Sequence, residues 1–466
     1  MKKINAVRLL ISFACALGTL AHLSTARASC TEGCGSYSSS SACWCDTLCS
    51  NYGDCCVDYA AQCLAPPTPI CPTSRTWRAS TLLQARPPGG FLSRTYPDVG
   101  IAADGTAIAI WQWTDFMPSG FRGVRARRFA RGSFGGFTFW FWTAATDIAT
   151  GTALLSSSSP ARVAVGSGGH AFVTLPTGDL VRYLPSSGWS SLSSSGLPAT
   201  RTSFARAVDA AGALMYLYES SSSLQVARRG GYAWETPDFL GTSTPSPDLA
   251  SNSSGDFGAI FDPSYAYVMR RDEAEGGGFT ARATHLSCSN GRVGIADDGT
   301  VLGVWFGSPN TVQFARLNTA SITAPIDVAA YASGALFNLR LAVNGAGQAI
   351  ASWLHAGSLG YEVIAALYAP STGWSAPTTL AASAVATLGG LPNLEVGIDG
   401  CGGAHLVHED IGYKGYAFDY LPGVGWGTRY TFTGPVLFPR IATAADGVAT
   451  VVWDNDQNEV LAARFE

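Results

Sequence analysis

The chain has 466 residues, 13% of them charged, and a formal net charge of −4 at pH 7. The first 28 residues hold four basic residues and no acid, so the rest of the chain carries a net charge of −8. A chain this acidic has no electrostatic attraction for nucleic acid or for an anionic membrane, and we expect neither as a partner. The length exceeds what one ordinary core can cover, unless the fold is a large symmetric one.

Residues 1–28 are typical of a secretory signal peptide. A basic start, "MKK", is followed by the apolar stretch "LLISFACALGTLAHL" and by "ARAS", and we expect cleavage after Ala28. The stretch is short for a membrane span, and no later segment reaches 18 unbroken apolar residues. We therefore expect a secreted, extracellular protein without a membrane span, whose cysteines meet an oxidising environment.

A small cysteine-rich domain is expected at residues 29–64. Its eight cysteines are Cys30, Cys34, Cys43, Cys45, Cys49, Cys55, Cys56 and Cys63. Metal binding is the alternative, but eight cysteines without a histidine in an exported chain favour disulfides. Each bridge would stabilise this short segment by roughly 2–4 kcal/mol, which replaces the hydrophobic core that it lacks. Spacing alone leaves many connectivities open.

The pattern C-x3-C-x8-C-x-C-x3-C-x5-C-C-x6-C, with "CDTLC", "CC" and "DY", resembles a somatomedin B domain. The resemblance covers Cys30 to Cys63 and implies four bridges: Cys30–Cys45, Cys34–Cys63, Cys43–Cys56 and Cys49–Cys55. It also implies a short helix that presents Asp46, Leu48 and Tyr52 to a protein partner. Asn51 stands where the best-known binder of the family has a tyrosine. The alternative is a stable spacer without a ligand.

Residues 65–74 are expected to form a Pro-rich linker, and residues 75–466 repeat themselves. Segments such as "VGIAADGTAIAIW" and "IATAADGVATVVW" each hold two apolar runs around a turn glycine, with an aromatic six residues further on. The glycines are Gly105, Gly169, Gly212, Gly255, Gly299, Gly347, Gly402 and Gly447. The residues six positions after these glycines are Trp111, Leu175, Tyr218, Phe261, Trp305, Trp353, His408 and Trp453. The pattern predicts β-hairpins, each formed by two strands in which apolar residues recur at every second position.

Two further strands follow in each unit, the third as in "VQFARL" and the fourth opening on an aromatic, as in "TGWSAP". Four antiparallel strands per unit predict an all-β fold, an eight-bladed β-propeller at residues 75–466. The last unit ends after its third strand, at Glu466, and an isolated "RTWRASTLLQ" follows the linker. We expect residues 76–83 to supply the missing strand and close the ring. An open β-repeat or a pair of sandwiches is the alternative. The repeat resembles sialidase-like and lectin-like bacterial propellers, but it departs from the sialidase Asp-box, so only the architecture is assigned.

Few polar residues suggest chemistry. His405 and His408 would point to opposite faces of a strand, which disfavours a shared metal ion. Asp454, Asp456 and Asn458 resemble the start of a calcium loop, although turns favour Asp and Asn in any case. Most arginines occur in third strands, at positions 125–128, 228–229, 270–271, 316 and 464, and are expected to be solvated outer charges. No cofactor is expected. The pairing of Cys71, Cys288 and Cys401 stays open.

Two functions fit these features. The favoured one is a secreted, monomeric, non-enzymatic binding protein: a somatomedin B-like module for protein recognition, joined to a propeller that binds a protein or a glycan. The recurring aromatics could line sugar pockets, although packing between sheets explains them better. The alternative is a glycosidase-like enzyme, which needs two carboxylates at the mouth of the ring. Candidates that follow second strands are Asp115, Asp262, Glu409 and Asp454.

Overall fold

The structure of the protein is a computed structural model, which describes residues 37–38, 43–44, 74–85, 95–114, 122–134, 137–151, 160–192, 197, 202–209, 212–230, 233–242, 247–261, 265–271, 279–286, 289–318, 321–357, 360–383 and 392–466. These residues form strands and turns and no helix, so the prediction of an all-β fold is confirmed. Accordingly, none of them forms a helix that could cross a membrane. In the cysteine-rich segment, β1 (Tyr37–Ser38) pairs with β2 (Cys43–Trp44). The signal peptide, the other seven cysteines and the residues Asp46, Leu48 and Tyr52 lie outside the described residues.

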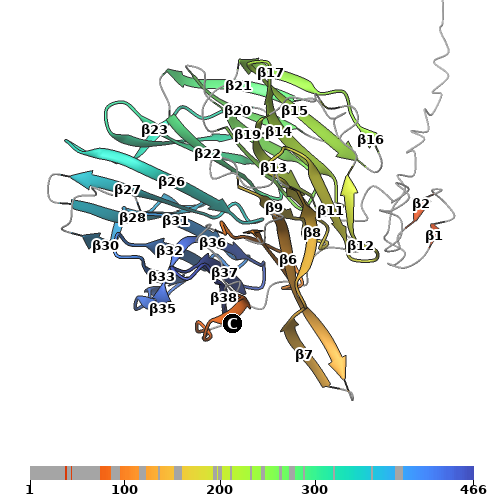
Figure 1. Cartoon of the computed structure of the whole chain (residues 1–466). Helices are drawn as coiled ribbons and strands as arrows, with labels where there is room; N and C mark the ends of the chain where they lie inside the picture. Colours follow the sequence, from red (N-terminus) through yellow and green to blue (C-terminus); the bar gives the residue numbers. More distant parts are fainter. Residues whose placement is uncertain are drawn as a thin grey trace, which may run out of the picture.

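The other described strands form a β-propeller of antiparallel sheets (Figure 1). We number these sheets along the chain. Sheet 1 comprises β4 (Asp98–Ile101), β5 (Ala107–Thr114), β6 (Arg122–Phe134), β7 (Phe137–Trp142) and β8 (Thr146–Thr150), and sheet 2 comprises β9 (Arg162–Val165), β10 (Ala171–Thr174), β11 (Leu180–Leu184) and β12 (Gly188–Leu192). Sheet 3 comprises β13 (Thr202–Val208), β14 (Leu214–Ser220), β15 (Ser223–Gly230), β16 (Ala233–Trp234) and β17 (Asp238–Thr242). Sheet 4 comprises β18 (Asp248–Ser251), β19 (Phe257–Phe261), β20 (Tyr265–Arg271) and β21 (Phe279–Leu286).

Sheet 5 comprises β22 (Ser289–Ile295), β23 (Val301–Gly307), β24 (Thr311–Leu317) and β25 (Ile326–Ala330), and sheet 6 comprises β26 (Ala335–Val343), β27 (Ala349–Gly357), β28 (Gly360–Ala369), β29 (Gly373–Trp374) and β30 (Thr378–Ser383). Sheet 7 comprises β31 (Leu394–Ile398), β32 (Ala404–Glu409), β33 (Lys414–Leu421), β34 (Gly425–Trp426) and β35 (Tyr430–Pro435). Sheet 8 comprises β3 (Thr81–Gln84), β36 (Leu437–Thr443), β37 (Ala449–Asp454) and β38 (Val460–Phe465). In sheets 1, 3, 6 and 7 two short strands share the place of the expected fourth strand, because both pair with the third strand.

The first strands of successive sheets lie next to one another. β4 contacts β9, β9 contacts β13, and the series continues through β18, β22, β26 and β31 to β36, which contacts β4 again. Hydrophobic clusters fill the spaces between consecutive sheets, including the space between sheet 8 and sheet 1. The core is therefore distributed around the molecule, with each sheet buried on both faces by its neighbours.

The turn glycines behave as the repeat predicts. All eight have positive φ, between 75° and 92°, and lie between the first and second strands of their sheets. In the turn of sheet 1, for example, Gly105 N donates to Ala102 O over 3.0 Å. A residue with a Cβ would be strained in this left-handed conformation, which explains why glycine recurs here.

The N-terminal segment supplies a strand to the last sheet. β3 pairs antiparallel with β38, and Trp77 forms an isolated bridge with Phe465. Arg78 N donates to Arg464 O over 2.7 Å. Residues 76–83 are the expected strand in this place, and the observed pairing runs from Trp77 to Gln84. This pairing covers the edge of β38 that would otherwise be exposed.

The recurring aromatics pack between sheets. Trp111, Trp305, Trp353 and Trp453 have no exposed surface, and Leu175 and His408 are also buried at the same repeat position. Side chains without exposed surface cannot stack on a sugar, so packing rather than sugar binding explains this set of aromatics.

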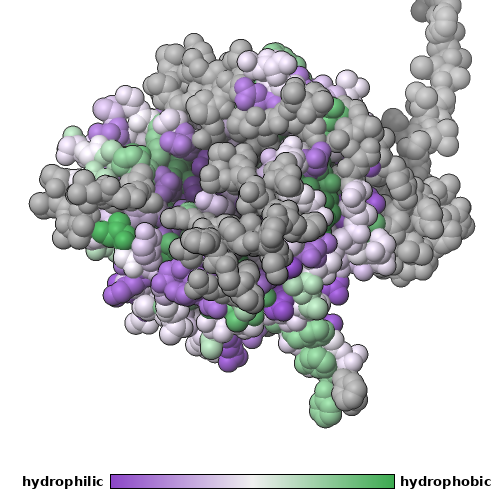
Figure 2. Space-filling model, viewed as in Figure 1, coloured by the Kyte–Doolittle hydropathy of each residue, from purple (hydrophilic) through white to green (hydrophobic). Residues whose placement is uncertain are grey.

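One hairpin extends beyond the body of the propeller. The ends of β6 and β7 project from sheet 1 (Figure 1), and Figure 2 shows apolar side chains along this projection. Phe137 is 78% exposed, and Phe139, Trp140 and Phe141 are about half as exposed. At its base the hairpin is anchored, because Trp140 stacks on Phe129 with 5.6 Å between ring centroids.

Candidate functional site: a cavity at the outer strands of sheet 7

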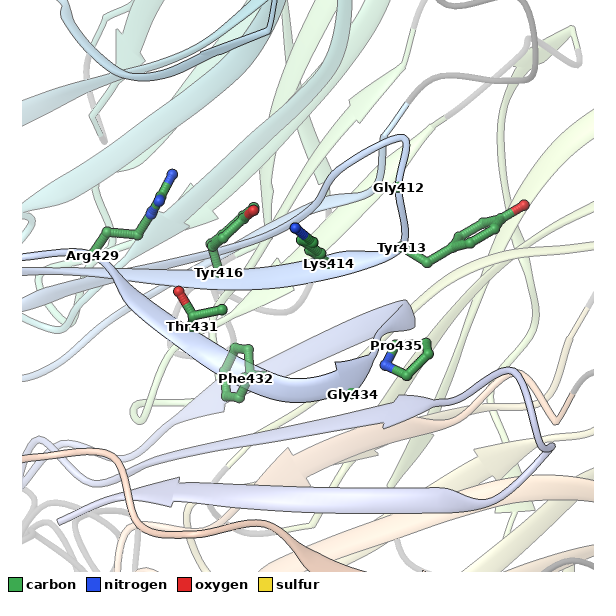
Figure 3. Close-up of a pocket in the computed structure, with 9 residues that line it drawn as sticks. All are labelled: Gly412, Tyr413, Lys414, Tyr416, Arg429, Thr431, Phe432, Gly434 and Pro435. Atoms are coloured by element: carbon green, nitrogen blue, oxygen red, sulfur yellow. The ribbon is translucent and has the colours of Figure 1, made fainter.

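A cavity of about 530 Å³ opens between β33 and β35, the outer strands of sheet 7 (Figure 3). Its lining residues are Gly412, Tyr413, Lys414, Tyr416, Arg429, Thr431, Phe432, Gly434 and Pro435. Cavities of this size hold small ligands.

An irregular pairing of the two strands accompanies the cavity. Lys414 pairs with Pro435 and Tyr416 with Thr431, so three residues of β35 stand opposite the single residue Gly415. Gly434, within this bulge, has a φ of 79°, which favours glycine. A Cβ on Gly415 would lie 2.4 Å from the Val436 side chain, so glycine is also needed on the facing strand.

A tight turn places two of the lining residues. The Asp410 side chain accepts hydrogen bonds from Gly412 N at 2.8 Å and from Lys414 N at 2.9 Å. This Asx-type turn holds Tyr413 at a φ of 59° and leaves its side chain 49% exposed. Tyr413 therefore stands at one end of the row of lining side chains, and Lys414 lies between it and Tyr416, as Figure 3 shows.

Tyr416 and Arg429 form the second polar group. The Arg429 guanidinium lies over the Tyr416 ring, 4.4 Å from its centroid, and the Tyr416 hydroxyl donates to Asp410 Oδ2 over 3.2 Å. Burial and the neighbouring Asp410 carboxylate both raise the pKa of Tyr416, so the phenol stays protonated and can donate. Neither Lys414 nor Arg429 has an ion-pair partner within the described part of the chain, which leaves both charges for a ligand.

The floor of the cavity is rigid. Phe432 is 4% exposed and packs on Trp453 and Trp77, with centroid distances of 5.1 and 5.5 Å. Behind Tyr416 lies His408, whose burial lowers its pKa to about 4, so its imidazole is neutral near pH 7. The site therefore combines a buried aromatic floor with the two cations Lys414 and Arg429 and one exposed tyrosine.

The carboxylates considered for hydrolysis act as links between sheets. Glu409 is 6% exposed and accepts from Asn393 Nδ2 at 2.6 Å and from Phe438 N, in sheet 8, at 3.1 Å. Asp454 has no exposed surface and accepts from Thr95 N, which precedes sheet 1, at 2.8 Å. Asp115 and Asp262 lie outside the described residues.

Of the calcium candidates, Asp454 is the last residue of β37, and Asp456 and Asn458 lie in the turn between β37 and β38. Asp454 points into the space beside Thr95, whereas Asp456 is exposed. The turn itself is closed by Asn455, whose Oδ1 accepts from Gln457 N and Glu459 N, both at 2.9 Å. Within the described ranges, no group of three or more His, Cys, Asp or Glu side chains could hold a metal ion.

The two histidines of sheet 7 face opposite sides, as the strand geometry predicts. His405 Nδ1 lies 2.7 Å from Asp419 Oδ1 and its ring contacts Phe465, whereas His408 contacts Tyr361 and Tyr416. Cys401 is disulfide-bonded, and the two other cysteines of the linker and ring, Cys71 and Cys288, lie outside the described residues.

The view of third-strand arginines as solvated charges is wrong for Arg464 and Arg229, which are both 7% exposed. Arg464 Nη1 donates to Thr450 Oγ1 over 2.8 Å, and its guanidinium lies 4.0 Å from the ring of Phe129 in sheet 1. It is buried because the third strand of sheet 8 packs against sheet 1, so the side chain joins the last sheet to the first.

The N-terminal segment matches a known domain family. Residues 28–66 match the family model of the somatomedin B domain. That segment is a somatomedin B domain. No curated protein matches the chain.

Among solved structures, the chain is similar to the BP39L lectin from Burkholderia pseudomallei, with 12% identity over 74% of this chain and 100% of that one and a TM-score of 0.47. It is also similar to the hydrazine synthase of Kuenenia stuttgartiensis (12% identity, 64% and 94% covered, TM-score 0.46). A third similar structure is the α-L-arabinanase of Penicillium chrysogenum in complex with arabinobiose (12% identity, 57% and 93% covered, TM-score 0.34). At these values the similarities carry no argument about function.

Proposed function

We propose that the chain is a secreted, non-enzymatic binding protein, in which a somatomedin B module for protein recognition is joined to an eight-bladed propeller that binds a glycan or a protein. We infer eight blades from the eight sheets of four or five strands and from the unbroken series of contacts between their first strands. The proposed ligand site of the propeller is the sheet 7 cavity.

The observation that carries this proposal is the chemistry of the cavity wall. None of the nine lining residues is an acid, whereas hydrolysis of a glycosidic bond uses two carboxyl groups. Tyr413 offers an exposed ring for stacking, and Lys414, Arg429 and the Tyr416 hydroxyl offer donors to ligand oxygens. Such a wall can bind and orient a ligand.

The somatomedin B module gives the proposal its second part. Asp46, Leu48 and Tyr52 are the residues that the family resemblance assigns to partner recognition. A pull-down with the full chain and with the variants Asp46→Ala and Tyr52→Ala tests this assignment. We expect both variants to lose the partner, and identical recovery would show that the module acts as a spacer.

A glycan-array screen of the purified mature chain tests the cavity. Tyr413→Asn, which tolerates the positive φ, and Arg429→Gln should each weaken binding at least about tenfold, or about 1.4 kcal/mol. Phe239→Ala is the matched control, because Phe239 is 66% exposed on sheet 3. Equal binding by all variants would remove the cavity from the proposal, and release of sugar products from bound glycans would instead support the glycosidase alternative.

A further inference from the structure

The first strands of the sheets carry a charged side chain at one repeated position. In seven sheets it stands seven residues before the turn glycine, and in sheet 3 the charged residue stands six before Gly212. We call these eight residues the axial annulus: Asp98, Arg162, Arg206, Asp248, Arg292, Arg340, Glu395 and Arg440.

These side chains converge on one another across the ring. Arg206 Nη2 lies 3.7 Å from Asp98 Oδ2, although sheet 2 stands between their sheets, and Arg162 Nη1 lies 4.0 Å from Asp98 Oδ1. On sheets 6 to 8, Arg340 Nε lies 3.3 Å from Glu395 Oε1, and Arg440 pairs with the same oxygen. Only first strands that face a common axis can bring together side chains from sheets that are not neighbours.

The arginines of the annulus repel one another. Burial lowers the pKa of Arg440 well below its usual value, and Arg162, Arg340 and Arg206 lower it further, opposed by Asp98. Burial likewise lowers the pKa of Arg206 to about 10, with Asp98 acting in the opposite direction. Burial also lowers the pKa of Arg292 and that of Arg340, and the Asp248 carboxylate opposes both shifts.

The carboxylates do not balance these arginines. Five guanidinium groups face three carboxylates, which leaves two positive charges in excess. Two of the carboxylates also accept hydrogen bonds from the backbone: Asp98 Oδ2 from Val163 N at 2.8 Å and Asp248 Oδ2 from Val293 N at 3.1 Å. Moreover, Arg206 Nε is buried and has no hydrogen-bond partner among the described residues. A buried donor without a partner costs free energy that an acceptor would recover.

We propose that the axial annulus binds a small oxyanion with two negative charges, such as inorganic phosphate or a dicarboxylate. Guanidinium groups bind such oxygens in pairs, and arginine keeps its charge where lysine would lose it. The side chains that form these ion pairs keep between 11% and 27% of their surface exposed, so solvent reaches the charges. This site lies on first strands, separate from the sheet 7 cavity, and does not depend on the proposed function.

Calorimetric titration of the full mature chain with inorganic phosphate and with succinate tests the proposal, against sodium chloride at equal ionic strength. Arg206→Gln should weaken binding at least about tenfold. Asp248→Asn, which keeps an acceptor for Val293 N, should tighten it several-fold because it raises the positive excess. Arg125→Gln is the matched control, since Arg125 pairs with Asp147 on the outer strands of sheet 1.

The outcomes separate the ligands and the alternatives. Binding of phosphate alone assigns a tetrahedral oxyanion, and binding of succinate alone assigns a dicarboxylate. Absence of binding by both, or equal loss in Arg206→Gln and Arg125→Gln, overturns the proposal. If Arg206→Gln fails to fold, Asp248→Asn decides, because unchanged affinity in that variant contradicts an electrostatic site. Tyr413→Asn should leave oxyanion binding unchanged.

Discussion

The replacement Trp77→Ala tests whether the N-terminal segment holds the last sheet together. Trp77 is 7% exposed and its ring contacts Tyr430, Phe432 and Phe465, with centroid distances of 6.2, 5.5 and 5.4 Å. Its indole Nε1 donates to Asp419 Oδ2 over 3.0 Å. Trp77 therefore joins the N-terminal segment to both sheet 7 and sheet 8.

The expected loss follows from these contacts. Truncating a buried tryptophan to alanine costs roughly 3–5 kcal/mol, and the lost hydrogen bond to a carboxylate adds about 1 kcal/mol, because Asp419 keeps His405 as a partner. A loss of about 5 kcal/mol is large beside the roughly 5–15 kcal/mol that stabilises a typical domain. We therefore expect Trp77→Ala to unfold at a much lower urea concentration.

Urea unfolding followed by far-ultraviolet circular dichroism measures this loss. Arg78→Ala is the control, because the Arg78 side chain is 63% exposed and its ion pair with Glu466 spans 3.6 Å at the surface. Such a pair contributes at most about 1 kcal/mol. If Trp77→Ala costs no more than Arg78→Ala, the segment does not stabilise the ring and the reasoning is refuted.

Two further changes have clear expectations. The pKa of His408 falls from 6.5 to about 4 on folding, so the unfolded chain binds the proton more readily and stability declines as the pH falls from 6.5 to 4, by roughly 3 kcal/mol in total. His408→Phe should remove this part of the pH dependence in urea titrations at pH 7 and pH 4, and an unchanged slope would contradict it. Gly294→Val should lower stability by roughly 1–3 kcal/mol, since a Cβ there lies 2.2 Å from Val343 Cγ2; a melting temperature equal to that of the parent would show that the neighbouring strand yields.

Much of the fold could be predicted from the repeat, because a turn glycine leaves a local signal. Glycine is favoured in the tight turn between the first two strands, where φ is positive, and a large side chain six residues later fills the space between two sheets. Gly105 and Trp111 illustrate the pair. Both requirements act within a few residues, so the sequence displays them in each unit.

The two candidate sites escaped prediction for different reasons. The sheet 7 cavity depends on three residues of β35 standing opposite Gly415, a register that no local pattern reveals. The axial annulus does have a signal, a charged residue seven positions before most turn glycines, as in Asp98 and Arg440. That signal is hard to recognise because its sign varies from unit to unit and because the third strands are also rich in arginine.

The varying sign of the annulus is itself informative. A structural ring of charges would be most stable with equal numbers of the two signs, because each buried charge then has its own partner. Here Asp98 serves both Arg162 and Arg206, and Glu395 serves both Arg340 and Arg440. Each shared carboxylate leaves one guanidinium less than fully compensated, and the positive excess accumulates where the first strands face the common axis. A bound oxyanion would neutralise the excess positive charge without any change in the fold. Replacing an arginine of the annulus by a neutral residue would remove that excess charge, and with it the attraction for an oxyanion. The distinction between a ligand site and a purely structural ring therefore rests on Asp248→Asn: tighter oxyanion binding identifies a site, and a change confined to the melting temperature identifies a structural ring.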